Sequence, residues 1–287
     1  MNVHGFDPVA RTSLLTTALR IRESARPDRL YDDPYAAALA GEVGVALFDE
    51  VARLTADSRA PGLPDTADYN AVRTRFIDDR LAEALASGAV DQVVIAAAGM
   101  DTRAYRLDWP HPVDVYELDR AAVLDAKEAA LHGHRPAGNV RRHPVPTDLV
   151  TDDWRAGLTA AGFEPARRAV WVLEGVLYYL TAAEVHTLLA DLGRFAAGGS
   201  PLICDLLGEE ALDAPPIRGL LDLFASWGSP WVSGSDEPET LLAGYGFTVT
   251  ATQPGEPGAD YGRWTDTVPD RSVPGVARVF LVHGTRD

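Results

Sequence analysis

The stretch QVVIAAAGMDTRAYRL, residues 92–107, decides how this chain folds. It opens with an apolar run that ends in small residues, which is typical of a buried strand followed by a tight turn. Four further short apolar runs follow it: VDVYELD (113–119), NVRRHPV (139–145), AVWVLEG (169–175) and SPLICDLL (200–207). The segments between these runs have helical spacing. Strands that alternate with helices predict βαβ units, and therefore an α/β fold whose parallel sheet carries helices on both faces.

The chain on either side of this region has a different pattern. The first ninety residues predict helices. Near the C-terminus, two more strands are predicted at 247–252 and 277–284, joined by a segment rich in proline and glycine. We therefore expect one compact unit. It has a helical N-terminal cap over residues 1–90 and an α/β domain over residues 91–287, with an insertion at about 208–236 that forms a lid.

The composition is that of a folded, acidic protein. Acidic side chains outnumber basic ones by 42 to 26, which gives a formal net charge of −16. This charge disfavours binding to nucleic acids or anionic membranes, because both carry negative phosphates. The single cysteine, Cys204, excludes an internal disulfide and a cysteine-rich zinc site, and the seven histidines lack metal-binding spacing. No secretory leader or membrane span is evident, so we expect a soluble cytoplasmic protein without a metal centre.

Small and acidic residues occur where the predicted strands end. They are Gly99 after the first strand, Asp119 at the end of the second, Asp148 after the third and Glu174 after the fourth. In a parallel sheet these carboxyl ends meet at one edge, where ligands bind. The dinucleotide motif G-x-G-x-x-G and the phosphate-binding motif G-x-x-x-x-G-K-[ST] are absent. Several carboxylates without a phosphate anchor favour a nucleoside that carries positive charge and no phosphate, such as the sulfonium S-adenosylmethionine.

The stretch 92–107 also resembles the glycine-loop motif of the leucine carboxyl methyltransferase family, which includes bacterial polyketide carboxyl methyltransferases of the tetracenomycin type. Further segments resemble the family in order and spacing: TALRIRESARPDRLYDDPYA (17–36), AVRTRFIDD (71–79), VYELDRAAVLDAK (115–127), VPTDL (145–149) and LEGVLYYL (173–180). The resemblance implies a Rossmann-like class I methyltransferase sheet, mostly parallel with an antiparallel last strand. It also implies S-adenosylmethionine as the cofactor.

The resemblance implies residues for the methionine end of this cofactor. Arg73, assisted by Arg22, would pair with the methionine carboxylate. Gly99 would let its loop lie against the methionine part, and Glu174 would face the same end. Where the family usually has Gly-Ala-Gly, this chain has Ala-Ala-Gly at 97–99. The methyl group at position 97 would crowd the cofactor, unless that residue keeps a negative φ.

The resemblance implies residues for the nucleoside end as well. Asp119 would bind the two ribose hydroxyls, Asp148 would accept from the adenine amino group, and the backbone N–H of Leu149 would donate to the ring. From the residues alone, Asp119 and Asp148 could instead cap the helices that follow them. Tyr179, which follows the fourth strand, is our candidate for a catalytic residue in the acceptor pocket.

Methyl transfer from a sulfonium is an in-line displacement, so the enzyme mainly aligns the acceptor oxygen, the methyl carbon and the sulfur. A carboxylate acceptor is already ionised at pH 7 and needs no general base. We therefore expect O-methylation of a small-molecule carboxylate, in a polyketide or another natural product, by a monomer or homodimer. The acidity of the chain favours such a metabolite over an acidic protein tail.

Three alternatives stay open at this point. A phenol or alcohol acceptor would need a base to take its proton, for which His143 and His186 are candidates. A non-catalytic nucleoside-binding protein on the same fold is compatible with alanine at position 97, since fold does not fix function. A nicotinamide-dependent oxidoreductase is disfavoured because the dinucleotide motif is absent.

Overall fold

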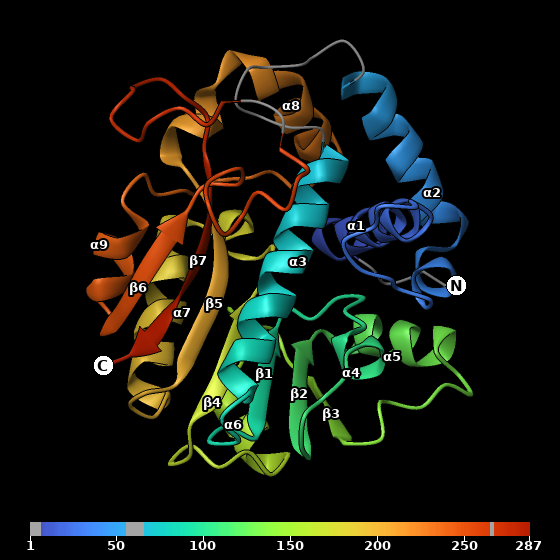
Figure 1. The fold of residues 1–287 in the computed structure, drawn as a ribbon, viewed down its shortest axis with the longest axis vertical. Coiled ribbons are helices and arrows are strands. Elements are labelled where there is room, and N and C mark those ends of the chain that lie inside the picture. The colour runs from blue at the N-terminus through green and yellow to red at the C-terminus, as the bar shows by residue number, and fades with distance from the viewer. Residues whose placement is uncertain (1–6, 56–65, 265–266) are drawn as a thin grey trace.

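The computed structural model describes residues 7–55, 66–264 and 267–287, and a seven-stranded sheet runs through its centre (Figure 1). The strands are β1 (Gln92–Ala96), β2 (Val113–Asp119), β3 (Val140–Pro146), β4 (Ala169–Leu173), β5 (Pro201–Leu207), β6 (Phe247–Thr252) and β7 (Val279–Arg286). Their order is β3-β2-β1-β4-β5-β7-β6. The first five strands pair in parallel, and β7 pairs antiparallel with both of its neighbours. The predicted α/β fold, mostly parallel with an antiparallel last strand, is confirmed.

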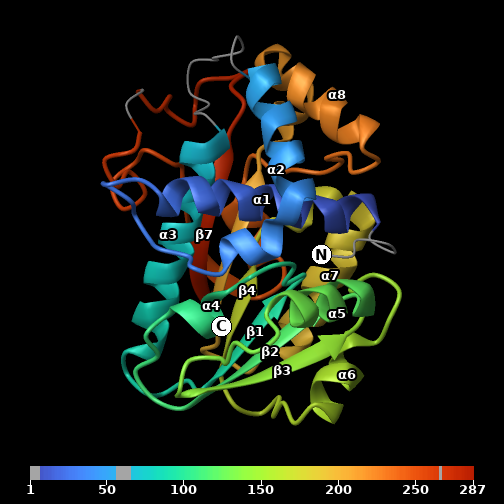
Figure 2. The same ribbon diagram turned by 90° about the vertical axis from the view of Figure 1, so that its right-hand side faces the viewer.

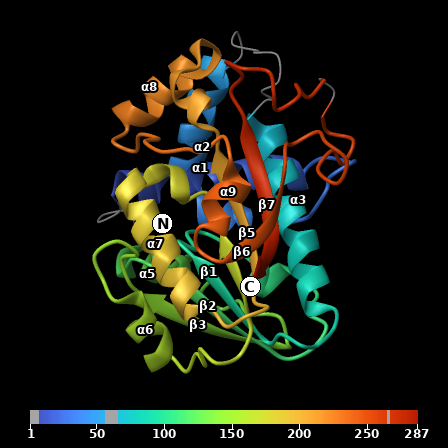
Figure 3. The same cartoon turned by 90° about the vertical axis from the view of Figure 1, so that its left-hand side faces the viewer.

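Helices cover both faces and one end of this sheet. They are α1 (Pro8–Ser24), α2 (Ala36–Thr55), α3 (Thr66–Leu85), α4 (Arg103–Arg106), α5 (Ala121–Ala130), α6 (Trp154–Ala160), α7 (Ala182–Phe195), α8 (Arg218–Ser226) and α9 (Pro238–Ala243). Residues of α3, α4 and α5 share one apolar core with the sheet. Residues of α6, α7 and α9 form a second core on the opposite face, so that the sheet lies between α3 and α7 (Figure 3).

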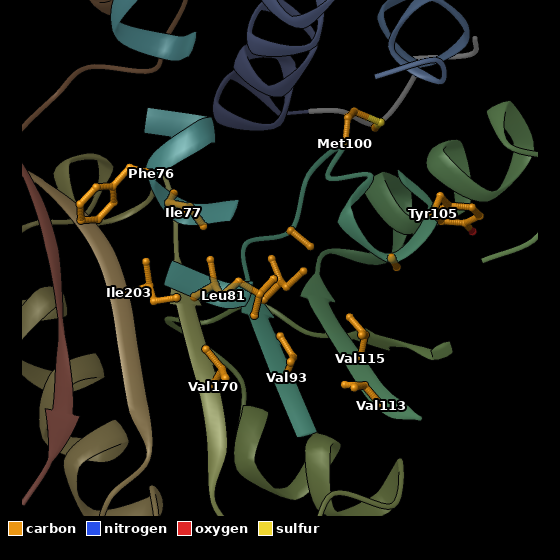
Figure 4. Packing of buried hydrophobic residues seen from close by; sticks show 14 of the residues in the cluster. Phe76, Ile77, Leu81, Val93, Met100, Tyr105, Val113, Val115, Val170 and Ile203 are labelled. Carbon is orange, nitrogen blue, oxygen red and sulfur yellow. The ribbon is translucent and has the colours of Figure 1, made fainter. Parts of the chain in front are cut away.

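The two cores follow from the alternation of side chains along each strand. In β1, Val93 belongs to the same core as Phe76 and Leu81 of α3 (Figure 4). The next residue, Val94, belongs to the core of the opposite face together with Trp154. A strand that is buried on both faces reads as a continuous apolar run, which is why β1 was evident in the sequence.

A third group of helices lies at one end of the sheet (Figures 1 and 2). Helix α1 packs against α2, and α2 packs against α8, which belongs to the segment predicted to be an insertion. Helix α3, in contrast, packs directly on β4, β5 and β7. The predicted cap over residues 1–90 thus has two different parts, and its residues 1–6 and 56–65 lie outside the described residues. The boundary at residue 90 stays a prediction.

The described helices and acidic or metal-ligating side chains show neither a membrane span nor a metal-binding cluster. None of their helices is long and apolar enough to cross a membrane. Within the same residues, no group of three or more His, Cys, Asp or Glu side chains is arranged to hold a metal ion.

Candidate functional site

A cleft opens between α1 and the carboxyl ends of β1 and β4. Residues 95–103 form one wall, and Asp119, Glu174 and Tyr179 contribute from the ends of other strands. One side of α1 forms the wall opposite the strand ends, and Arg73 of α3 also lines the cleft. The cleft is open to solvent, and polar and apolar side chains both line it. The sheet therefore presents a cleft at the edge where α/β folds bind ligands.

Asp119 fixes the loop that follows β1. Its Oδ2 accepts a hydrogen bond from the backbone N–H of Gly99 at 2.7 Å, and its Oδ1 accepts from the N–H of Arg120 at 2.7 Å. Gly99 has a φ of +47°, and a Cβ at this position would lie 2.9 Å from the Cβ of Ser13, so the position requires glycine. Burial raises the pKa of Asp119, although the two N–H groups act in the opposite direction. A carboxylate oxygen has two acceptor positions, so Asp119 keeps capacity for ligand hydroxyls.

The methyl group of Ala97 is expected to be harmless only if the residue keeps a negative φ, and its φ is positive. Its φ is +52°, and among the described non-glycine residues only Ala97 and Tyr261 have a positive φ. Ala97 also lines the cleft. Alanine thus occupies a left-handed conformation that glycine adopts without strain, and its side chain adds bulk beside the cleft.

Arg73 is buried between two carboxylates. Its Nε lies 3.0 Å from Oε1 of Glu174, and its Nη1 donates to Oδ2 of Asp205 at 3.0 Å. The same Nη1 donates to the Tyr178 hydroxyl at 3.2 Å. The second oxygen of Glu174 accepts from Arg103 at 2.7 Å. Burial alone would raise the pKa of Glu174, but Arg103 and Arg73 hold it below its ordinary value. Glu174 therefore stays ionised within this network.

Five guanidiniums and three carboxylates line the cleft, and carboxylates are in excess once the ion-pair partners of these arginines are included. Arg103 connects Glu174 to two further carboxylates, Asp78 and Asp101. The described charged residues of the lining and their ion-pair partners are seven carboxylates, Asp7, Asp33, Asp78, Asp101, Asp119, Glu174 and Asp205, and five guanidiniums, Arg20, Arg73, Arg103, Arg106 and Arg120. Such a surplus suits a ligand with a net positive charge.

The structure does not bring Arg22 to this cleft. Its side chain is exposed, and the guanidinium lies 5.6 Å from the centre of the Phe48 ring. Arg20, on another side of the same helix, lines the cleft instead and donates to the Met100 carbonyl at 2.6 Å and to Asp33 at 2.8 Å. Arg22 therefore does not line this cleft, because the rotation of α1 turns its side chain away, and its predicted contact with the cofactor stays a prediction.

Asp148 and Leu149 also lie outside the cleft lining. Oδ1 of Asp148 accepts from the N–H groups of Val150 at 2.8 Å and Thr151 at 3.2 Å, so this carboxylate caps its own turn. Leu149 lines a separate small apolar hollow with residues such as Trp154. Their predicted contacts with adenine are not tested by this arrangement.

Sequence reasoning missed several residues of this network. Asp205 interrupts the apolar run of β5 just as Glu174 interrupts the run of β4, and the same signal could have found it. Asp78, Arg20 and Arg103 stand inside the quoted motifs, but their spacing alone did not show that they face one another. Asp205 and Arg73 are 132 residues apart in the chain.

Comparisons with known proteins agree with this architecture. A family model described as leucine carboxyl methyltransferase matches residues 13–193. A protein of Mycolicibacterium smegmatis, provisionally named an S-adenosyl-L-methionine-dependent methyltransferase, is 36% identical over 93% of this chain and 90% of its own length. A relative from Streptomyces avermitilis with the same description is 37% identical over 91% of this chain and 90% of its own.

Solved structures show the same fold at low sequence identity. A DUF574 family protein from Streptomyces avermitilis gives a TM-score of 0.60 at 12% identity, and covers 92% of this chain and 98% of its own. A structure from Thermobifida fusca, provisionally named a methyltransferase, gives 0.53 at 18% identity over 91% and 94%. The family model and the relatives go further than fold: this chain belongs to the leucine carboxyl methyltransferase family.

Proposed function

We propose that this protein transfers the methyl group of S-adenosylmethionine to a carboxylate of a small molecule, such as a polyketide or another natural product. Through its family the chain is an S-adenosylmethionine-dependent methyltransferase; the acceptor is the part we infer. The observation that carries this inference is the make-up of the cleft. No histidine, lysine or cysteine occurs among the described residues that line it.

The acidic residues of the lining are poorly suited to act as a general base. Burial opposes ionisation of Asp101 and Glu174, yet Arg103 brings the pKa of Asp101 to about 2, and Arg103 and Arg73 lower the pKa of Glu174. Burial raises the pKa of Asp119, but this carboxylate accepts two backbone N–H groups, and we assign its remaining acceptor positions to the ribose hydroxyls rather than to the methyl acceptor. A phenol or alcohol acceptor must lose a proton to a base, whereas a carboxylic acid is already ionised at neutral pH. This difference supports an ester product over an ether.

The charges of the cleft residues support this cofactor. When bound, its sulfonium would supply the methyl group. Arg73 would pair with the methionine carboxylate, and Glu174 would balance the positive charge at the same end. Asp119 would accept from the ribose hydroxyls, and Gly99 would let the backbone approach the ligand closely. The main contribution of these groups is alignment, which can lower the barrier by roughly 7–11 kcal/mol in favourable cases.

Tyr179 is our candidate for orienting the acceptor. It lines the cleft, and burial raises its pKa, so the phenol stays protonated at neutral pH and can donate a hydrogen bond to a carboxylate. Asp148 and Leu149 follow β3 at the same edge of the sheet, and we retain them as a proposal for the adenine end.

The test is a methylation assay with methyl-labelled S-adenosylmethionine and pairs of aromatic acids and phenols of matched size. We expect label in an ester formed from an acid, released by mild base, and none in the matched phenol. Asp119→Ala serves as the control, and it should lose both turnover and calorimetric binding of S-adenosylhomocysteine. Micromolar binding to the wild type would correspond to about −8 kcal/mol. A base-stable methylated product would contradict the proposed acceptor.

A further inference from the structure

We propose that Asp205 is the positioning residue that holds Arg73 in place for the methionine carboxylate of the cofactor. The inference rests on the proposed function and deepens it, because it assigns a residue that no motif identified. Asp205 lies within β5, and none of its surface is exposed. Its neighbour Ile203, two residues earlier on the same strand, belongs to the core under α3. Strand alternation therefore directs Asp205 towards α3.

Groups from two different elements converge on the Asp205 carboxylate. Oδ2 accepts from the Tyr69 hydroxyl at 2.9 Å and from Nη1 of Arg73 at 3.0 Å, both on α3. Oδ1 accepts from the backbone N–H of Gly175 at 2.6 Å, in the turn that follows β4. One carboxylate thus fixes the guanidinium and also the turn that carries Glu174.

Asp205 acts through Arg73, because it is not among the described residues that line the cleft, whereas Arg73 is. With Nε beside Glu174 and Nη1 on Asp205, the planar guanidinium is held in one orientation. Gly175 has a φ of +64°, and a Cβ there would lie 3.4 Å from Nη1 of Arg73. The turn therefore packs closely on the guanidinium that Asp205 holds.

The substitution Asp205→Asn keeps the packing of the side chain but removes the charge and the second acceptor that position Arg73. Asparagine has nearly the same shape, but one of its two terminal atoms is a donor. It cannot accept from Gly175 and from Arg73 on separate oxygens. If its oxygen faces Gly175, its amide N–H₂ meets the guanidinium as donor against donor. If its oxygen instead faces Arg73 and Tyr69, its amide N–H₂ opposes the N–H of Gly175 and displaces the turn that packs on the guanidinium. In both orientations the negative charge that holds Arg73 is lost. Asp205→Ser, which keeps an acceptor and has no charge, is a second variant should the first not fold.

Two probe ligands report on the end of the site to which Arg73 belongs. S-adenosylhomocysteine and 5′-methylthioadenosine share the nucleoside and the sulfur, but only the first carries the amino-acid part, with its carboxylate and its ammonium group. Calorimetric titration gives the ratio of their two dissociation constants for each variant. We expect Arg73→Gln and Asp205→Asn each to reduce the preference for S-adenosylhomocysteine by about tenfold or more, since a charge-assisted pair is lost. The affinity for 5′-methylthioadenosine should change by less than about twofold, since none of its groups faces Arg73.

Glu117→Gln is the matched control. Glu117 of β2 is as fully buried as Asp205, but it pairs with Lys127 at 2.7 Å and with Arg142 at 3.0 Å. The Glu117→Gln variant should keep the wild-type preference for S-adenosylhomocysteine over 5′-methylthioadenosine. If Arg73→Gln lowers the preference and Asp205→Asn does not, the inference fails while the cofactor site stands. If Asp205→Asn weakens both ligands equally, its role is structural and the inference also fails. A wild type that binds neither ligand would overturn the proposed function itself.

Discussion

At the scale of single residues, the conformation of Ala97 is the clearest conflict between sequence and backbone. A left-handed conformation costs an L-residue roughly 1–2 kcal/mol. Glycine at the same position avoids this strain but loses about 0.4–1 kcal/mol through the greater freedom of the unfolded chain. Strain at a cleft residue is retained when the surrounding structure fixes the backbone, as the Asp119–Gly99 hydrogen bond does two residues later.

Ala97→Gly should therefore stabilise the protein by up to about 1 kcal/mol. The variant should also bind S-adenosylhomocysteine at least as tightly as the wild type, because it removes a methyl group that lines the cleft. Urea denaturation and calorimetric titration measure these two effects. Ala98→Gly is the control: Ala98 is not among the described residues with a positive φ, so this variant should be less stable than the wild type. A loss of stability in Ala97→Gly would contradict the strain argument.

At the scale of elements, Arg103 joins pieces that are distant in the chain. It belongs to α4, and its guanidinium contacts Asp78 of α3, Asp101 of the loop after β1, and Glu174 after β4. All these side chains are buried or nearly so. Breaking a buried ion pair by removing one partner is costly, because the remaining charges stay buried without compensation.

Arg103→Met keeps an unbranched apolar stem but removes the guanidinium and its charge. We expect it to lower the free energy of unfolding by about 3–5 kcal/mol, measured by urea denaturation. Arg194→Met is the matched control, since Arg194 pairs with Asp191 in i,i+3 spacing and its side chain is 69% exposed. That variant should change stability by no more than about 1 kcal/mol. Equal effects of the two substitutions would show that the buried network does not connect these elements.

At the scale of the whole molecule, the shifted pKa values predict that ligand binding and folding stability are lost over different pH ranges. Burial raises the pKa of Asp119, so its ionised form costs stability at neutral pH, and it becomes protonated at a pH above its ordinary 3.8. Asp101 and Glu174 act in the opposite sense: despite burial, neighbouring arginines lower their pKa values. Because the unfolded chain binds their protons more tightly, their contribution to stability is full above the unfolded values and is lost as the pH falls through the folded ones.

We therefore expect the affinity for S-adenosylhomocysteine to decline with a midpoint above pH 3.8, as Asp119 becomes protonated. The contribution of Asp101 to stability should be lost only as the pH falls below 3.8 towards about 2. Calorimetric titrations with S-adenosylhomocysteine and urea midpoints, measured on the same samples across this pH range, would distinguish the loss of affinity from the loss of stability. Arg103→Met should flatten the pH dependence of the urea midpoint, because Asp101 and Glu174 then lose the partner that lowers their pKa values. Undiminished affinity in folded protein below pH 3.8 would contradict the assignment of Asp119.

The sequence by itself determined the sheet and the residues at its strand ends. Strands buried on both faces need continuous apolar runs, and each run marks where its strand stops, so Gly99, Asp119 and Glu174 could be placed at one edge. The family motifs added Arg73 to this set. All four residues line the cleft. Their positions could be inferred because each depends on a local pattern, while their contacts with the cofactor stay a prediction.

Only the tertiary structure decided which charges meet. Arg20 and Arg22 stand about 200° apart around an α-helix, and the packing of α1 selects the first for the cleft. The pairing of Arg73 with Asp205 joins a helix to a strand 132 residues later. The left-handed backbone of Ala97 is likewise imposed by its surroundings. Periodicity specifies elements and their buried faces, but the rotation of a helix and the partner of a buried charge depend on contacts between segments far apart in the chain.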